Sequence, residues 1–339
     1  MDILFLFVSL VIILIAAELF VNAIEWLGKI MNLSEGAVGS ILAAVGTALP
    51  ETLIPIIALV AGDASHAEDI GIGAILGAPL MLSTLTMFVT GCAVLFFKKK
   101  RKHKDKVMVD AKSISHDLKF FIMSFIIALA CGLLPQSLKS IKILFAAILF
   151  INYFVYIIKI VKEDRKQDED LPDLYFAFHK KSITESKYLT IVVVIQAIIS
   201  LILIVVGAEK FVDSITQIST SLHVPAFILS LILAPIATEL PEKFNSVIWV
   251  SREKDTLALG NITGAMMFQA SILPAIGILL TDWSLTSAGT IISSLIAIAS
   301  ASLLLFELNE KKHMTVKMLL LCGLFYFIFL MLIFSGIIR

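Results

Sequence analysis

The sequence predicts an all-α membrane protein with ten transmembrane helices arranged as two inverted-topology repeats of five. Three observations lead to this fold class. The 339 residues are 59% hydrophobic and 16% charged, with a mean hydropathy of +0.98, well above the roughly half-apolar makeup of soluble domains. The apolar residues gather in stretches of about 20, the length a helix needs to cross a bilayer. Segments of the first half also recur in the second half.

Ten stretches are apolar and long enough to span a hydrocarbon core about 30 Å thick. They are expected to be helices, because a helix satisfies its backbone groups internally and a β-barrel would show short segments of alternating hydrophobicity. The expected spans start near Asp2, Ser34, Ile70, Leu118, Lys139, Tyr188, His223, Thr256, Leu285 and Met314.

Two motifs of the first half recur in the second half in constant register. Residues 17–21 (AELFV) match residues 208–212 (AEKFV), and residues 47–51 (TALPE) match residues 238–242 (TELPE). Both pairs lie 191 positions apart, from 17 to 208 and from 51 to 242. A glycine-rich pair, GAILGA and GNITGA, follows them. Each copy contains an odd number of spans, so the second copy enters the membrane from the opposite face, which is typical of transporters.

The repeat divides the chain into a first five-helix unit at 1–162, a linker at 163–187 and a second five-helix unit at 188–339. Basic residues gather after the third, fifth, seventh and ninth spans, and the positive-inside rule makes these loops and the linker cytoplasmic and both termini extracellular. The N-terminus lacks the basic region of a cleaved signal, so the first span is expected to remain. A prokaryotic plasma membrane is expected.

Glu51 and Glu242 are the two carboxylates to explain. An ionised group at bilayer depth costs at least about 2.5 kcal/mol, so such groups usually face the bundle interior and serve a function. Each follows a proline, which removes a hydrogen bond and frees the carbonyl of Gly46 or of Ala237. A bound cation would satisfy those oxygens. The alternative is that both glutamates are neutral hydrogen-bond partners with a structural role.

Thr47 and Thr238 lie four residues before the two glutamates, so in helical backbone each hydroxyl shares a face with its carboxylate. The repeat symmetry turns both faces toward one another. Two carboxylates, two hydroxyls and the freed carbonyls make an all-oxygen site, which suits a hard cation such as Ca²⁺ with its six to eight oxygen ligands.

Residues 46–51 (GTALPE), their weaker copy at 237–242 and the glycine-rich spans that follow resemble the α-repeats of the cation/calcium exchanger superfamily. Here the α-repeats would cover about 34–97 and 223–281. The resemblance implies an ion-binding core of spans 2, 3, 7 and 8, across which spans 1 and 6 slide during alternating access. It also implies that Glu51, Glu242, Thr47 and Thr238 are the cation ligands.

The chain departs from the superfamily pattern where the resemblance places sodium ligands. After the second glycine, and four positions further on, the superfamily has serine and then a polar or acidic residue. This chain has Ala78 and Leu82 in the first repeat and Ala265 and Gln269 in the second. The sequence therefore does not decide whether Na⁺ is the coupling ion, whereas the central site keeps its two carboxylates.

Further polar residues within the spans are candidates for a secondary or coupling role. Glu239 lies one turn from Glu242, so it either shares a site and a proton with Glu242 or pairs with Lys243. Lys243 itself sits about 100° around the helix from Glu242 and is expected to extend toward the cytoplasm; the alternative is that it is a built-in cation of the site. Glu18 and Glu209, which match in the two halves, either face the ion path or are solvated near a span end. Asn261 and Gln269 are weaker candidates, since amides in bundles often bond between helices.

These residues predict a secondary antiporter that exchanges Ca²⁺, or a similar divalent cation, for Na⁺ or H⁺. The cations are substrates, and no resident cofactor, nucleic acid or obligate protein partner is indicated beside the lipid bilayer. The alternatives are a proton-coupled or other-cation exchanger and a non-transporting membrane sensor with the same fold. The sequence contains no P-loop, which argues against an ATP-driven pump. An intramembrane hydrolase has little support, because HExxH and GxSxG motifs and paired aspartates in a catalytic context are absent from the sequence.

Overall fold

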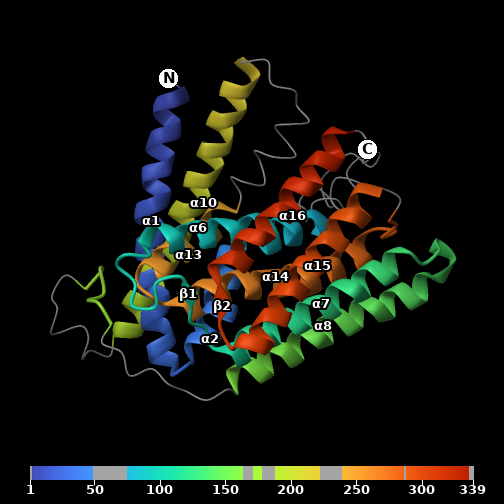
Figure 1. The fold of residues 1–339 in the computed structure, drawn as a ribbon, viewed down its shortest axis with the longest axis horizontal. Helices are drawn as coiled ribbons and strands as arrows, with labels where there is room; N and C mark the ends of the chain where they lie inside the picture. Colours follow the sequence, from blue (N-terminus) through green and yellow to red (C-terminus); the bar gives the residue numbers. More distant parts are fainter. Residues whose placement is uncertain are drawn as a thin grey trace.

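The computed structural model of the chain describes residues 2–48, 75–162, 171–177, 188–221, 239–285 and 288–335. These residues are mostly helical (Figure 1), as the apolar composition predicts. The elements are α1 (Asp2–Met31), α2 (Glu35–Ala37), the π-helix η1 (Val38–Ala43), α3 (Ala44–Thr47), the π-helix η2 (Leu82–Thr86), α6 (Met87–Phe97), β1 (Lys106–Val107), α7 (Ala111–Gly132), the 3₁₀-helix η3 (Gln136–Leu138), α8 (Lys139–Val161), α10 (Leu189–Ser221), α13 (Leu240–Ser251), α14 (Asp255–Leu280), α15 (Ala288–Lys311), β2 (Met314–Thr315) and α16 (Val316–Phe334).

Eight helices within the described ranges are long and apolar enough to cross a membrane. Seven of the predicted spans have a described helix beginning within three residues of the expected start, and these are the spans predicted near Asp2, Ser34, Lys139, Tyr188, Thr256, Leu285 and Met314. The predicted starts at Ile70 and His223 lie outside the described residues. Ten spans, and their relation as inverted repeats, remain a prediction.

The start predicted near Leu118 is wrong by about two helical turns, since α7 already begins at Ala111. Asp110 caps this helix, and its side chain accepts hydrogen bonds from two backbone N–H groups of the first turn, as N-cap carboxylates commonly do. Charged residues in the first two turns had marked this segment as a loop. The corrected boundary brings Asp117 inside the helix.

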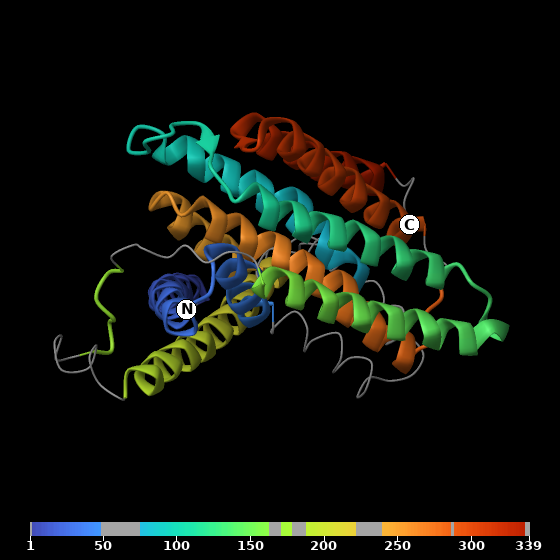
Figure 2. The same cartoon turned by 90° about the horizontal axis from the view of Figure 1, so that it is seen from below.

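The helices form two groups that cross at a steep angle. Helices α1 and α10 lie side by side and rise together out of the bundle in Figure 1, and Figure 2 shows α10 passing beside α1, which is seen end on. Helices α7, α8, α14 and α15 run roughly along the long axis of the molecule. Helices α1 and α10 correspond to spans 1 and 6, the two that the family resemblance sets apart from the ion-binding core.

Helix α14 is the centre of the bundle, and every residue from 255 to 271 is buried. It packs on η1 with almost no space between the backbones. A Cβ atom placed on Gly264 would lie 2.2 Å from the Ser40 carbonyl oxygen, and one on Gly39 would lie 2.9 Å from the Leu257 carbonyl oxygen. Small residues allow such close approach in membrane bundles. Gly39 in η1 and Gly264 in α14 therefore allow the close contact between these two helices.

Large apolar side chains are exposed on the outer helices, as expected for a protein in contact with lipid. Examples are Phe154 on α8, Ile202 on α10 and Met331 on α16, with exposed fractions of 61%, 55% and 71%. A soluble protein rarely exposes so much contiguous apolar surface. The chain is therefore an integral membrane protein.

The basic segment after α6 has a structural role in addition to any effect on topology. Arg101 is buried and donates to both carboxylate oxygens of Asp255, at 2.8 and 2.6 Å, and to the Val250 carbonyl at 2.7 Å. The strand β1 within this segment pairs antiparallel with β2 before α16. These contacts fix the loop between α6 and α7 to the start of α14.

Residues 171–177 of the predicted linker lie across α1 and α10. Trp26 of α1 donates to the Pro172 carbonyl at 3.0 Å, and Asn22 accepts from the Tyr175 backbone N–H at 3.2 Å. Gln196 of α10 donates to the Asn22 side-chain oxygen at 2.9 Å. The linker segment thus connects α1 and α10 to one another.

Candidate cation site

Glu242 lies in the first turn of α13, directly after Pro241. Proline is well tolerated there because the N–H it lacks has no partner within the helix. The Glu242 side chain is fully buried, and neither carboxylate oxygen accepts a hydrogen bond in the described part of the chain. A buried carboxylate is costly unless a proton, a hydrogen bond or a cation compensates it. The geometry therefore leaves two acceptor oxygens for a ligand.

Thr47, from the first half of the chain, is linked to Glu242 through Asn261. It ends α3, is fully buried, and its Oγ1 lies 3.2 Å from Oδ1 of Asn261 on α14. The Asn261 amide donates in turn to the Glu242 backbone carbonyl at 3.4 Å. The motif residues of the two halves, although 195 positions apart in the sequence, are thus connected through one asparagine. Asn261 makes the interhelical bonds expected of an amide in a bundle, and it does so at the predicted site.

Gly46 lies beside Thr47 in α3 and faces α1, because a Cβ atom there would lie 2.9 Å from Phe20 Cζ. The absence of a side chain at this position lets α1 approach the motif closely. The other predicted ligands of the central site, Glu51, Thr238 and Ala237, lie outside the described residues.

Glu239 pairs with Lys243, which is one of the two alternatives the sequence leaves open. Lys243 Nζ lies 2.8 Å from Glu239 Oε2, and Thr86 of η2 donates to the same oxygen at 3.2 Å. The expectation that Lys243 extends toward the cytoplasm is wrong, since the residue is only 6% exposed. A buried ammonium group is more stable beside a buried carboxylate than beside apolar helices.

The remaining secondary candidates lie apart from Glu242. Glu18 on α1 accepts from the Tyr175 hydroxyl at 2.8 Å and forms an ion pair with Arg252 beyond the end of α13. Its carboxylate is about one-third exposed, so it sits at a helix contact near solvent. Gln269 is fully buried on α14, two turns beyond Asn261. The side chain of Glu209 lies outside the described residues.

Asn245 is a further candidate residue for the site, and the sequence alone did not point to it. It lies three positions after Glu242 on α13 and therefore on a similar side of the helix. The residue is fully buried, and its amide oxygen and nitrogen lack a hydrogen-bond partner within the described ranges. The spacing from Glu242 was the signal that could have identified it.

Glu25 on α1 was also missed, although it lies two helical turns after Glu18 on the same face. One carboxylate oxygen accepts from the Trp249 indole N–H at 3.0 Å, and the other lies 2.9 Å from Lys254 Nζ. With the pair formed by Glu18 and Arg252, these contacts tie α1 to the end of α13 and the start of α14.

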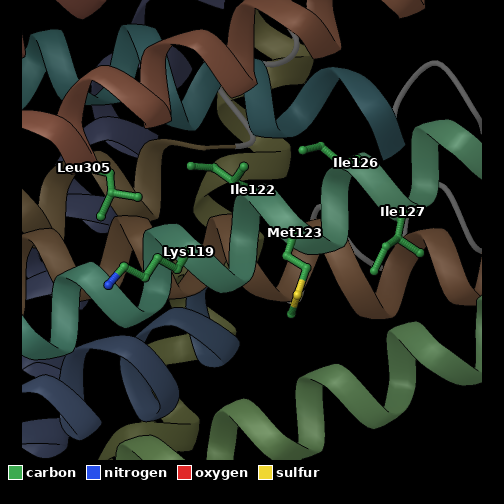
Figure 3. A pocket seen from close by; sticks show the side chains of 6 residues that line it. All are labelled: Lys119, Ile122, Met123, Ile126, Ile127 and Leu305. Atoms are coloured by element: carbon green, nitrogen blue, oxygen red, sulfur yellow. The ribbon is translucent and has the colours of Figure 1, made fainter.

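A separate hollow of about 380 Å³ lies against α7 and α15. Figure 3 shows that five of the six labelled side chains around it are apolar, and Lys119 is the sixth. Such a lining lacks oxygen ligands and places a positive charge nearby, so this hollow does not suit a cation. The oxygen atoms of Glu242, Thr47, Asn261 and Asn245 make a chemically better site for a hard cation.

Several known proteins share the sequence pattern and the fold of this chain. Residues 1–162 and 192–335 match the profile of a family described as sodium/calcium exchanger protein. An uncharacterized membrane protein of Methanocaldococcus jannaschii is 25% identical over 76% of this chain and 74% of its own length. The inner membrane protein YrbG of Escherichia coli is 23% identical over 81% and 79%. The putative antiporter CaxA of Alkalimonas amylolytica is 23% identical over 91% and 90%.

A solved structure shares the fold. The sodium-calcium exchanger NCX_Mj, soaked with zero Na⁺ and Ca²⁺, superposes with a TM-score of 0.75 at 21% identity, covering 96% of this chain and 97% of that one. The family profile covers both halves of the chain, including the helices that carry Thr47, Asn261 and Glu242. Its members are membrane transporters rather than enzymes. The chain belongs to the sodium/calcium exchanger family.

Proposed function

We propose that this protein is a secondary active antiporter that exchanges Ca²⁺, or a similar divalent cation, for Na⁺ or H⁺ by alternating access. The observation that carries the proposal is the buried Glu242 carboxylate, which has no hydrogen-bond partner among the described residues and lies where Asn261 joins it to Thr47. The cation would bind between the two halves of the chain. Cations are thus substrates in this proposal, and no resident cofactor is required.

The ligand set proposed for the central site is Glu242 and Thr47 together with Glu51, Thr238 and the carbonyls of Gly46 and Ala237. Two carboxylates would neutralise one divalent ion, and the hydroxyl and carbonyl oxygens would bring the number of ligands into the range that Ca²⁺ prefers. The similarity to NCX_Mj, which is named a sodium-calcium exchanger, supports this choice of substrate.

Helices α1 and α10 are the moving elements in this proposal. They pack along one another and are joined by the linker segment at 171–177. Their contacts with the rest of the bundle include the ion pairs of Glu18 with Arg252 and Glu25 with Lys254. If basic loops are cytoplasmic, these ion pairs close the cytoplasmic side, and breaking them would open it.

Proton coupling is the second candidate, and a specific observation favours it. The positions where the family resemblance places sodium ligands hold Ala78, Leu82, Ala265 and Gln269. Three of these four side chains lack an oxygen atom, so these positions offer too few ligands for a sodium ion. A proton needs only one basic oxygen atom.

The test is Ca²⁺ uptake into proteoliposomes under an outward Na⁺ gradient and, separately, an outward H⁺ gradient. We expect uptake by the parent under at least one gradient, and its loss in Glu242→Gln and Glu51→Gln, because the charge that holds the cation is removed. Glu310→Gln, which changes an exposed glutamate at the end of α15, serves as the matched control. Cation binding by the parent without flux under either gradient would favour the sensor.

A further inference from the structure

A second buried carboxylate lies in the bundle, at Asp117 on α7. Its Oδ2 atom accepts hydrogen bonds from Ser40 Oγ at 2.6 Å and Thr263 Oγ1 at 2.5 Å, and its Oδ1 atom from the Tyr156 hydroxyl at 3.0 Å. The residue is fully buried. The proposed function assigns it no role, and such residues within membrane spans commonly mark ion or proton pathways.

Two of the three hydroxyl partners of Asp117 lie on α14, which carries Asn261, or on η1, which leads directly into the α3 helix of Thr47. Ser40 is in η1, seven residues before Thr47, which is about 10 Å along a helix. Thr263 is on α14, two residues after Asn261. Ser40 also lies at the closest backbone contact between these elements, beside Gly264. The carboxylate therefore touches both helices whose relative position sets the distance between Thr47 and Asn261.

The hydrogen bonds around Asp117 can be completed in both of its charge states. An ionised carboxylate only accepts, and all three hydroxyls can donate to it. A protonated carboxyl must donate one bond, and two of the hydroxyls can then turn to a carbonyl instead. Tyr156 has the Ser40 carbonyl at 3.3 Å, and the Thr263 hydroxyl has the Leu259 carbonyl at 2.9 Å. A proton can thus bind or leave with only the rotation of hydroxyl groups.

We propose that Asp117 is the proton-binding site of the exchanger, and that its proton is the ion exchanged for the cation. This inference rests on the proposed function and identifies its counterion. When the cation enters the Glu242 site, the O–H bond of Asp117 breaks and the proton leaves to the solution. When the cation departs, a proton from the opposite side binds the same oxygen. Each cycle thereby moves one proton against one divalent cation, and one net positive charge moves in the direction of the cation.

Glu239 is less suited to this role, because a fixed cation, Lys243, lies 2.8 Å from its carboxylate and favours the ionised form. Among the hydrogen bonds of the described residues, Tyr156 is the titratable partner of Asp117, and the ring of Tyr153 lies 5.9 Å from that of Tyr156. The other charged or titratable groups on α7 and on the elements packed against it are Glu35 on α2, Lys112, His116, Lys119 and Cys131 on α7, Lys139, Lys142 and Lys159 on α8, Asp255 on α14, and Glu307, Glu310 and Lys311 on α15.

The experiment compares two kinds of Ca²⁺ flux in proteoliposomes, uptake driven by an outward H⁺ gradient and Ca²⁺/Ca²⁺ exchange without a pH gradient. In Asp117→Asn we expect gradient-driven uptake to fall at least about fivefold, in line with common coupling between sites, while Ca²⁺/Ca²⁺ exchange continues and loses its dependence on pH. The asparagine oxygen can still accept from Ser40 and Thr263. Glu310→Gln again serves as the control.

Tyr156→Phe gives an independent measurement. It removes the hydrogen bond that Oδ1 accepts, and such charge-assisted bonds stabilise the ionised form most. We expect the midpoint of the pH dependence of Ca²⁺/Ca²⁺ exchange to move to higher pH.

Parental gradient-driven uptake in Asp117→Asn, or an unmoved midpoint in Tyr156→Phe, would overturn the proton site. A parent that exchanges Ca²⁺ for Ca²⁺ but responds only to Na⁺ would overturn it as well and leave the proposed function intact. A parent that shows neither flux would contradict the proposed function itself.

Discussion

Gly264 on α14 is where the smallest substitution should disturb the cation site most. The Cβ atom of an alanine there would lie 2.2 Å from the Ser40 carbonyl oxygen and 2.5 Å from its Cα. Both are backbone atoms, so the contact cannot be relieved by a change of rotamer. Ordinary contacts of this kind are at least 3.4 Å, and η1 must therefore move from α14 by about 1 Å, at a typical overpacking cost of about 1–3 kcal/mol.

The same movement should break the contact between Thr47 and Asn261. Asn261 lies one turn from Gly264 on the same helix, and its Oδ1 is 3.2 Å from Thr47 Oγ1. An added separation of about 1 Å exceeds hydrogen-bond range, and a misplacement of this size at a reacting site can cost roughly 100-fold in rate. We expect Gly264→Ala to lower Ca²⁺ uptake by one to two orders of magnitude, with a smaller loss of thermal stability.

Gly77 provides the matched control, because it occupies the corresponding position in the glycine-rich segment of the first half. An alanine Cβ atom there would meet no heavy atom of the described chain within 4 Å. We expect Gly77→Ala to transport normally and to be slightly more stable, since alanine favours helix over glycine by up to about 1 kcal/mol. Uptake rates and melting temperatures that are equal in the two variants would refute the reasoning.

Three further perturbations follow from the contacts of α13 and α1. Lys243→Met leaves the buried Glu239 carboxylate without its cation and should cost about 3–5 kcal/mol of stability, much of which the added Glu239→Gln change restores. Thermal unfolding in detergent measures this, and equal losses in the single and double variants would contradict it. Asn245→Leu should raise the Ca²⁺ concentration for half-maximal uptake about tenfold, or about 1.4 kcal/mol. We expect no loss of stability, because the replaced amide has no hydrogen-bond partner among the described residues; unchanged uptake would exclude this residue from the site. Glu25→Gln removes the charge that pairs with Lys254, in a contact where the Glu25 side chain is only 2% exposed. If this pair holds one conformation, its loss should make a single cysteine on one side of the site react faster with a thiol reagent and a single cysteine on the other side react more slowly. Unchanged labelling rates would show that the pair does not hold one conformation.

Most of the elements that form the core could be predicted from the sequence. Long apolar stretches identify helices in a membrane protein because the bilayer requires internally bonded backbone. The duplicated motif identified Thr47 and Glu242, which the structure connects through Asn261. A proline before a carboxylate within a span is rare enough to mark the site before any neighbour is known.

Residues whose role depends on partners far away in the sequence were not predictable in the same way. Asp117 lies among charged residues, so hydropathy placed it in a loop, whereas the cap at Asp110 starts the helix two turns earlier. From its position on the helix, Lys243 was expected to extend to the cytoplasm, but it pairs with Glu239 and stays within the bundle. In both cases local hydropathy describes the cost of burying a charge and contains no information about the groups that offset it.

The sequence by itself determined that this protein crosses the membrane with helices, carries two related motifs, and presents carboxylates and hydroxyls suited to a hard cation. These properties depend on composition and spacing, which are local. The tertiary structure decided which of those groups meet. It brought Thr47 to Asn261 across a backbone contact that only glycine permits, paired Glu239 with Lys243, and surrounded Asp117 with three hydroxyls. Burial makes each such meeting energetically strong, because within the bundle little water competes for these groups.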